Sequence, residues 1–208
     1  MGLEALARIY PPAFFAQWGR ANAAYVASAR VIADELQRQL GPRRLVDVGC
    51  GCGVYAARFA RLGVEVVAID GVRAPAAAGF GVEVAIRDLT APLVDEWGPF
   101  DLALCLDVGE HIPQALCDVF LDNLTGLADT LVLSCAPPGQ GGDHHVNEQP
   151  KRWWIDRLAA HGFAYQRPAT GRLCERFKQL RPPLMWMWEQ ISVYRRIDRA
   201  EFRRGNSK

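Results

Sequence analysis

The chain lacks the sequence features of membrane, exported and nucleic-acid-binding proteins. None of its apolar runs approaches the length needed to cross a bilayer, and its N-terminus does not pass from basic to apolar residues as a signal peptide does. We therefore expect a cytoplasmic protein without a membrane partner. A formal net charge of +1 offers no electrostatic surface for long nucleic acid.

Cysteine pairs with metal-binding or disulfide spacing are also missing. The six cysteines include no CxxC pair, so we expect them to remain reduced thiols. Cys50 and Cys52 are close in sequence, but small residues fitted between glycines are a better interpretation than a metal pair. No linker divides the chain, which indicates one main domain. We divide the sequence into an N-terminal helical cap, a main domain and a basic tail, at residues 1–40, 41–197 and 198–208.

Apolar segments of strand length alternate with helical segments along the main domain. Strands are predicted at residues 44–48, 64–69, 82–86, 100–104, 130–134, 163–167 and 190–195. Helices are predicted at residues 21–40, 54–62, 113–124 and 151–161, with a short aromatic helix before them. This pattern predicts an α/β fold: a single Rossmann-like, doubly wound, mostly parallel sheet with an antiparallel last strand and an N-terminal helical segment.

The sequence LVDVGCGCG, residues 45–53, joins the first predicted strand to its helix through three alternating glycines. Asp70 ends the next strand about twenty residues later, where an acid accepts hydrogen bonds from the ribose of a nucleoside held by the glycine loop. Val54 stands where a dinucleotide fingerprint requires Gly or Ala, which disfavours an NAD-dependent dehydrogenase. Asp47, before the first glycine, suits a cationic ligand instead, such as the ammonium and sulfonium groups of S-adenosylmethionine.

From about residue 40 to residue 195 the sequence resembles class I S-adenosylmethionine-dependent methyltransferases. VDVGCGCG resembles the first motif of that family, Asp70 its ribose-binding acid, and Asp88 in IRDLT the residue facing the adenine amino group. FDLALCLDVGEHIP resembles the fourth motif, which lies under the reacting methyl group. The cofactor contacts that the resemblance implies are Asp47, Gly49, Cys50, Gly51, Gly53, Asp70, Gly71, Asp88, Leu89 and Leu106. A later stretch, PPGQGGDHHVNEQPKRWWIDRLAAHGF, resembles a bacterial branch associated with saccharide or secondary-metabolite methylation.

Acids and histidines follow the fourth and fifth predicted strands of this domain. Asp107, Glu110 and His111 have the spacing i, i+3, i+4, which predicts one face of a helical turn, although Pro113 disfavours helical geometry at Ile112. His144 and His145 lie in a glycine-rich loop after the next strand. Since the carboxyl ends of parallel strands meet at one edge of the sheet, we expect one of these histidines to join the cluster.

The cluster resembles the metal site of 2′-O-methyltransferases that act on small-RNA ends, and in part that of ubiquinone-pathway O-methyltransferases. The resemblance implies that Asp107, Glu110, His111 and His145 hold a divalent cation such as Mg, Mn, Fe or Zn, with Asp107 standing where those families carry Glu. A bound cation lowers the pKa of a coordinated hydroxyl. Without a metal, His111 or His145 serves as general base, and Asp107 completes the catalytic set. A third interpretation is that these are solvated acids and loop histidines.

Aromatic residues outside the predicted sheet have two interpretations. The segment containing Tyr10, Phe14, Phe15 and Trp18 either covers a pocket or packs on the core, and packing is favoured. The same choice applies to Trp153, Trp154, Trp186 and Trp188, which form an acceptor wall or belong to the core.

Together these features predict S-adenosylmethionine-dependent methyl transfer to a hydroxyl of a small molecule or saccharide, with or without a metal. The alternatives are transfer to nitrogen, carbon or sulfur without a metal, and a non-catalytic cofactor-binding subunit.

Overall fold

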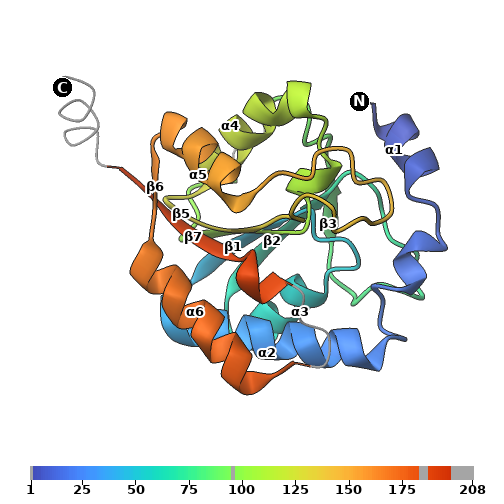
Figure 1. Cartoon of the computed structure of the whole chain (residues 1–208). Helices are drawn as coiled ribbons and strands as arrows, with labels where there is room; N and C mark the ends of the chain where they lie inside the picture. The colour runs from blue at the N-terminus through green and yellow to red at the C-terminus, as the bar shows by residue number, and fades with distance from the viewer. Residues whose placement is uncertain (1, 95–96, 183–186, 198–208) are drawn as a thin grey trace.

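The structure, a computed structural model of the chain, describes residues 2–94, 97–182 and 187–197. One seven-stranded sheet has the order β3-β2-β1-β4-β5-β7-β6 (Figure 1). Its strands are β1 (Arg44–Val48), β2 (Glu65–Asp70), β3 (Val84–Ile86), β4 (Leu102–Leu106), β5 (Thr130–Ser134), β6 (Phe163–Tyr165) and β7 (Ser192–Arg196). Strands β1 to β5 pair in parallel, whereas β7 runs antiparallel to both of its neighbours. The predicted mostly parallel sheet with an antiparallel last strand is confirmed.

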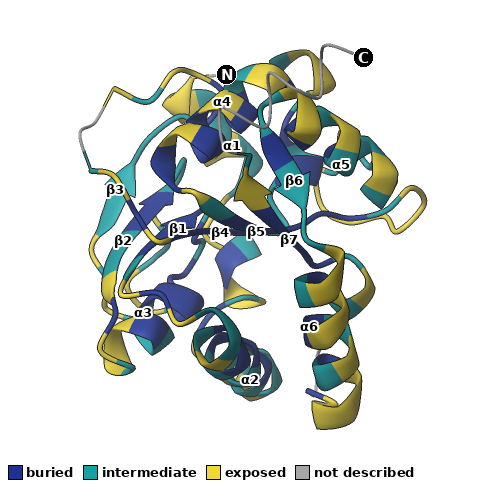
Figure 2. Ribbon diagram, turned by 90° about the vertical axis from the view of Figure 1, so that its left-hand side faces the viewer, coloured by how far each residue is buried: buried dark blue, intermediate teal, exposed yellow. Residues whose placement is uncertain are grey.

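Helices cover both faces of this sheet. Figure 1 shows α4 (Cys117–Leu127) and α5 (Lys151–Ala160) on one face, and α2 (Ala23–Leu40), α3 (Val54–Arg61) and α6 (Arg167–Leu180) on the other. Successive strand residues point to opposite faces, so Val46 packs in the cluster under α4 and α5 while Leu45 packs in the cluster under α2 and α3. Figure 2 shows the resulting buried middle of the sheet.

The long helix α2 begins and ends where its sequence dictates. The Asn22 side chain accepts a hydrogen bond from the Tyr25 amide, and Gly41 ends the helix with a left-handed φ of 56°. Ile32 and Leu36 lie one turn apart on the side buried against the sheet. Although we grouped α2 with the N-terminal cap, its packing makes it part of the core. The preceding α1 (Leu3–Ile9) buries no residue.

The strongest departure from the predicted elements is α6. Its first residue, Arg167, was assigned to a strand, and no helix was predicted after it, because its apolar stripe is narrow: only Thr170, Leu173 and Phe177 are buried. Pro168 stands in the first turn, where its missing amide donor costs nothing.

Other boundaries differ by a few residues, and one part of the chain is not described. The strand predicted from residue 100 begins at Leu102, and the helix predicted from residue 113 becomes a 3₁₀ turn, Gln114–Leu116, followed by α4. The predicted basic tail, residues 198–208, lies outside the described residues. Among the described helices, none has the length and apolar character that a membrane span requires.

Candidate active site

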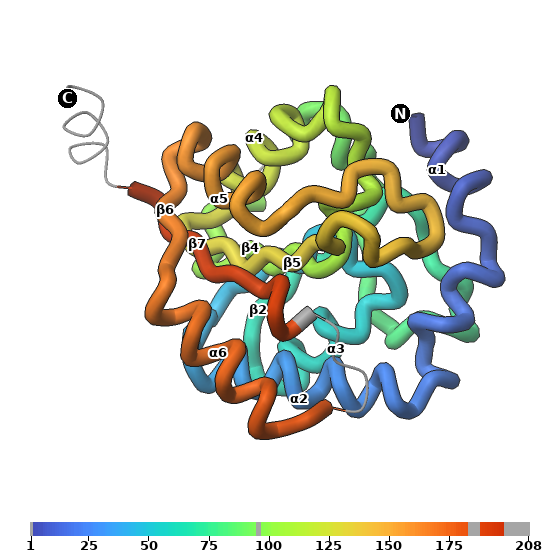
Figure 3. The backbone as a smooth tube through the Cα atoms, viewed as in Figure 1, coloured from blue at the N-terminus to red at the C-terminus, as the bar shows by residue number. Residues whose placement is uncertain are grey.

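A cavity of about 380 Å³ opens at the carboxyl ends of β1, β2 and β4. One side, which we call the glycine half, is lined by Asp47 and residues 49–52, by residues 70–72 after β2, and by residues 88–90 after β3. The other side, the histidine half, is lined by residues 107, 108 and 110–112 after β4 and by residues 140–143 and 145 of the loop between β5 and α5. Figure 3 shows this loop running beside the N-terminal segment, and the Tyr10 and His144 rings lie 5.7 Å apart there.

The loop of the glycine half is held by its own backbone. The amides of Gly49 and Cys50 donate to the Ile69 carbonyl at 2.8 and 3.0 Å, which ties the loop to β2. A side chain at Gly49 would be strained, since φ is 74° and an added Cβ would lie 2.3 Å from Val108 Cγ2. Gly51 has a φ of 55° and open space where a Cβ would stand. The loop therefore offers bare backbone to the cavity.

Two buried acids support this loop. Asp70 accepts hydrogen bonds from the Gly51 and Val72 amides, both at 2.8 Å, and burial raises its pKa despite these bonds. Asp47, 3% exposed, accepts from the Ala56 amide at 3.1 Å at the start of α3. Burial raises the pKa of Asp47 to about 7. Both carboxylates would gain from a cationic or hydroxyl-bearing ligand.

The structure places almost all of the expected cofactor-binding residues around the cavity. Those that line it are Asp47, Gly49, Cys50, Gly51, Asp70, Gly71, Asp88, Leu89 and Leu106. Asp88 accepts hydrogen bonds from the Thr90 amide and hydroxyl at 2.9 and 2.6 Å. Gly53 does not line the cavity; it begins α3 with a φ of 78°, packed against Val82. All six cysteines are free thiols, in agreement with the prediction.

The expected helical turn through Asp107, Glu110 and His111 is wrong. Asp107 has a φ of 54°, and the turn that follows is a single 3₁₀ turn, Gly109–His111. The Ser134 hydroxyl donates to the Asp107 carboxylate at 2.7 Å, so this acid is bound to the end of β5. As Pro113 predicts, Ile112 is extended, with a ψ of 120°.

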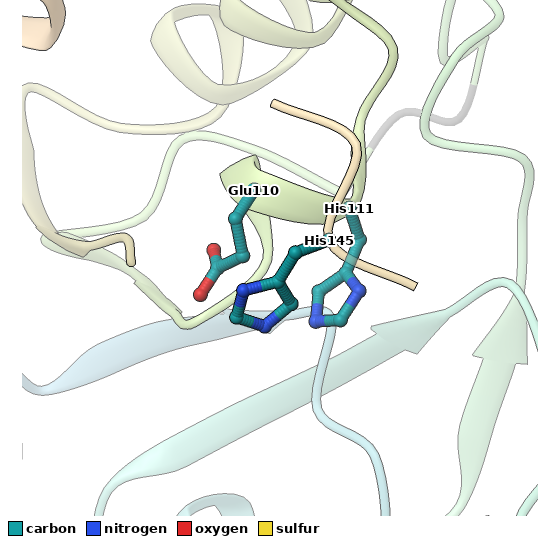
Figure 4. A group of neighbouring side chains, drawn as sticks. All are labelled: Glu110, His111 and His145. Atoms are coloured by element: carbon teal, nitrogen blue, oxygen red, sulfur yellow. The ribbon is translucent and has the colours of Figure 1, made fainter. Parts of the chain in front are cut away.

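Glu110, His111 and His145 nevertheless come together. One possible ligand atom of each lies within 4.8 Å of the others, and Figure 4 shows the three side chains extending into the same space. The two imidazole rings are nearly perpendicular, with centroids 5.0 Å apart. Within the described residues the group does not include Asp107, although Asp107 lines the same cavity. The adjacent His144 is exposed, with its ring against Tyr10.

Two buried atoms of this cluster have no partner. The Ala136 amide donates to one Glu110 oxygen at 3.0 Å, while the other oxygen, Oε2, has no hydrogen bond. Burial, and then the nearby Asp107 charge, raises the pKa of Glu110 to about 8. His111 Nδ1 is likewise unpartnered, and burial lowers the pKa of His111 to about 4. Near neutral pH the cluster therefore contains a neutral imidazole beside a largely protonated carboxyl group.

His145 has a carboxylate partner that the sequence analysis did not identify. The Glu148 carboxylate lies 2.9 Å from His145 Nδ1 and accepts from the Gly139 and Gly141 amides at 2.8 and 2.7 Å. The hydrogen bond with His145 is the main cause of the lowered pKa of Glu148. An acid three residues after a histidine in a glycine-rich loop was the available signal.

The N-terminal aromatic segment covers the cavity, so the favoured interpretation as core packing is wrong. Residues Leu6, Tyr10, Phe14, Phe15 and Trp18 line the cavity, together with Tyr25 and Tyr55 from the first two core helices. The Tyr10 ring meets the His111 ring edge to face at 5.7 Å, and burial raises the Tyr10 pKa to about 12. The sequence carries no signal that separates this wall from core packing.

The later tryptophans that the structure describes do not line the cavity. Trp154 is 3% exposed and belongs to the core cluster under α4 and α5, and Trp153 packs beside it. Trp188 packs in the opposite cluster, where Lys178 Nζ lies 4.3 Å from its ring centroid. Core packing is therefore correct for these three residues, while Trp186 lies outside the described residues.

Sequence comparisons match most of the described chain. The sequence model of a family described as "Methyltransferase domain" matches residues 21–177. A ubiquinone biosynthesis O-methyltransferase from Pseudomonas entomophila is 28% identical over 165 residues, which cover 74% of this chain and 65% of that protein. The chain thus spans about two thirds of the length of the curated relative.

Solved structures share the fold at low sequence identity. One is the 1,6-didemethyltoxoflavin-N1-methyltransferase of Burkholderia thailandensis, solved with S-adenosylhomocysteine, with a TM-score of 0.62, 19% identity and coverage of 95% of this chain and 92% of that chain. Another is human N-acetylserotonin methyltransferase with S-adenosylmethionine, with a TM-score of 0.60, 13% identity and coverage of 94% and 59%. At these identities the matches establish the fold alone.

Proposed function

Since this chain belongs to the methyltransferase-domain family and has the class I S-adenosylmethionine-dependent methyltransferase fold, we propose that it transfers a methyl group from S-adenosylmethionine to a hydroxyl of an uncharged small molecule or saccharide. The observation that carries the proposal is the continuity of the cavity: the glycine half and the Glu110, His111 and His145 cluster line one space. A methyl donor in one half and an acceptor in the other would then be neighbours.

The glycine half has the chemistry for the cofactor. The Gly51 and Val72 amides each donate to a different oxygen of the Asp70 carboxylate, and an ionised carboxylate can accept a further hydrogen bond, here from a ribose hydroxyl. Asp47 lies beneath the loop as a buried carboxyl group that a cationic ligand would stabilise in its charged form. S-adenosylmethionine supplies an electrophilic methyl group on a sulfonium, so the protein has to align the acceptor and exclude water. The aromatic wall from Tyr10 to Trp18 supports both tasks.

Within the histidine half, His145 is the better candidate for the base that takes the hydroxyl proton. A base works best when its pKa lies near the working pH, and the pKa of His111, about 4, makes this residue a weak base. The Glu148 carboxylate lies 2.9 Å from His145 Nδ1, which holds the ring in place and leaves Nε2 as the nitrogen that can take the proton.

The same three side chains also fit a divalent cation. Neutral imidazoles and a carboxylate are suitable ligands, and the unpartnered Glu110 Oε2 is a buried oxygen without another use. Ligands of one zinc ion lie at most about 4.2 Å apart, so atoms at the 4.8 Å limit of the cluster would have to move closer. A bound cation would lower the pKa of the acceptor hydroxyl. Metal analysis of the purified protein, followed by chelator titration of turnover, distinguishes metal-assisted transfer from base catalysis.

The charges of the cavity support an uncharged acceptor. Its carboxyl-bearing residues are Asp47, Asp70, Asp88, Asp107, Glu110 and Asp143, and no Lys or Arg is found among the described residues that line it. A phosphate or carboxylate on the acceptor would find no Lys or Arg side chain among these residues to neutralise its charge. The proposal therefore favours small neutral alcohols, phenols and sugars over RNA ends and phosphorylated sugars.

Calorimetry and mass spectrometry test the proposal in sequence. We expect S-adenosylmethionine and S-adenosylhomocysteine to bind with one site per chain, and an absence of heat at millimolar ligand would contradict cofactor binding. A panel of neutral hydroxyl compounds, each paired with its phosphate ester, is then incubated with the cofactor and the protein. Methylation of the neutral member alone is the expected result, and preferential methylation of the phosphate ester would contradict the acceptor class.

A further inference from the structure

Glu148 closes the loop that connects β5 to the segment before α5. Its carboxylate collects three hydrogen bonds, from the Gly139 amide, the Gly141 amide and His145 Nδ1, at 2.8, 2.7 and 2.9 Å. All three partners belong to the loop that forms one wall of the histidine half. One half-buried side chain thus joins the beginning of the loop to its end.

The partner atoms decide which form of the His145 ring is present. A carboxylate only accepts hydrogen bonds, so the short contact with Glu148 requires a proton on His145 Nδ1. When the ring is neutral, its lone pair then stands on Nε2. This nitrogen is the one that a cation or an acceptor proton can use.

The backbone on the other side confines the same ring. A Cβ added to Gly142 would lie 2.4 Å from His145 Nε2, so the Gly142 backbone packs directly against the imidazole. Farther along, the Val146 and Asn147 amides both donate to the Glu110 carbonyl, at 2.9 and 3.0 Å. These bonds tie the loop to the 3₁₀ turn that carries Glu110 and His111. Glu148 is the charged group that completes this arrangement.

We propose that Glu148 is a positioning residue, whose carboxylate fixes the Nδ1-protonated form of His145 and the course of the loop, and so leaves the lone pair of the neutral ring on Nε2. Its role in turnover rests on the proposed function, but its effect on the ring and the loop does not. A carboxylate behind a functional histidine sets both the proton position and the ring orientation, and its removal typically costs about 10- to 100-fold in affinity or activity.

Nitrogen NMR of the protein without cofactor or acceptor tests the positioning directly. The expected wild-type result, at a pH where the ring is neutral, is a proton on His145 Nδ1. In Glu148→Ala the proton should shift toward Nε2, and the Gly139 and Gly141 amides should exchange at least about tenfold faster with solvent. Glu148→Asp keeps the charge on a shorter stem and should restore part of the protection. Glu175→Ala, on the exposed side of α6, is the control and should change neither signal.

The same variants are then assayed for binding and turnover. S-adenosylmethionine affinity should remain within about twofold in Glu148→Ala, whereas kcat should fall by about 10- to 100-fold, with partial rescue in Glu148→Asp. A wild-type ring protonated on Nε2 would overturn the proposal, even if the alanine variant did not fold. Unchanged glycine exchange in a folded Glu148→Ala variant would also overturn it. A protein that binds no S-adenosylmethionine would refute the proposed function instead and leave the NMR result to decide the role of Glu148.

Discussion

The glycine half and the histidine half of the cavity stand at the same edge of one sheet, but their polar groups are satisfied in different ways. In the glycine half, Asp47 accepts a hydrogen bond from the Ala56 amide of α3, and Asp70 accepts from the Val72 amide after β2 and from the Gly51 amide of the glycine loop. In the histidine half, Glu110 Oε2 and His111 Nδ1 are buried without a partner. The buried acids of the glycine half are thus hydrogen-bonded by the backbone. In the histidine half, two buried polar atoms remain able to bind a proton, a cation or an acceptor hydroxyl.

This difference implies separable functions. Changes in the glycine half should alter cofactor affinity, and changes in the histidine half should alter turnover. The two halves meet where the Gly49 backbone lies against the Val108 side chain, so both depend on this close contact. Four substitutions test the separation.

The largest expected effect is that of His145→Ala. Loss of a general base typically lowers the rate by about 100- to 10,000-fold, and S-adenosylmethionine affinity should stay within about twofold because no glycine-half contact changes. Steady-state kinetics on an identified acceptor, together with calorimetry, measures both quantities. His161→Ala removes a histidine at the end of α5, outside the cavity lining, and should leave both unchanged. Turnover within threefold of wild type in His145→Ala would contradict the proposal that the histidine half carries the chemistry.

Asp70→Ala should have the next largest effect, on the opposite property. The variant loses the ribose contacts and also the anchor for the Gly51 amide, which should weaken S-adenosylmethionine binding by about 100-fold. Calorimetry reads this change without an acceptor. Glu65→Ala, at the other end of β2 and with an exposed side chain, is the matched control. Equal cofactor affinity in the two variants would show that the ligand does not use the end of β2.

Asp47→Asn should change how stability depends on pH. The folded-state pKa of Asp47, about 7, lies above its ordinary value of 3.8, so the folded protein keeps a proton that the unfolded chain has lost between these pH values. This contribution to the free energy of unfolding is therefore present below pH 4 and is lost as the pH rises to about 7.

Asparagine can still accept from the Ala56 amide but carries no charge, so the variant should lack this loss. Urea unfolding without cofactor, at pH 5 and pH 8, should show a smaller decrease in the variant than in wild type, by about 2 kcal/mol. Parallel pH profiles for the two proteins would mean that Asp47 is not the buried acid responsible.

Tyr10→Ala should have the smallest effect and sharpen the role of the aromatic wall. The ring contacts His111 and His144 by its edge, so its loss should raise the acceptor KM by about tenfold. Tyr10→Phe keeps the ring and removes only the hydroxyl, and its KM should stay within about twofold. If Tyr10→Phe raises the acceptor KM as much as Tyr10→Ala, the hydroxyl and not the ring is the group that matters. If neither variant raises it, the aromatic wall does not contact the acceptor at Tyr10.

The two halves also differ in how far their sequence could predict them. The residues of the glycine half follow one strand in a continuous run or end the next strand, so a local pattern was sufficient to place them at the cavity. The cluster of the histidine half joins residues 110 and 111 to residue 145. It was predicted only because the loops after neighbouring parallel strands leave the sheet at the same edge. The left-handed backbone at Asp107 is not predicted by the sequence, because a non-glycine residue adopts it uncommonly, and Asp107 accepts a hydrogen bond from the Ser134 hydroxyl instead of joining the cluster.

Residues that act by tertiary contact were the least predictable. The N-terminal aromatics fold over the cavity from more than 120 positions before the His145 loop, and nothing in their own spacing distinguishes a wall from core packing. Glu148 has a role only through the turn that brings Gly139 and Gly141 to its carboxylate. The helix α6 was missed because its buried stripe is narrow and its first turn contains a proline.

The most direct test of the central claim is a crystal structure of the protein with S-adenosylhomocysteine. The account predicts ribose hydroxyls within hydrogen-bonding distance of Asp70, and the sulfur facing the space between Asp107 and the His111 and His145 pair. A ligand bound elsewhere, or a cavity filled by the N-terminal aromatic side chains with no ligand between Asp70 and His145, would contradict it.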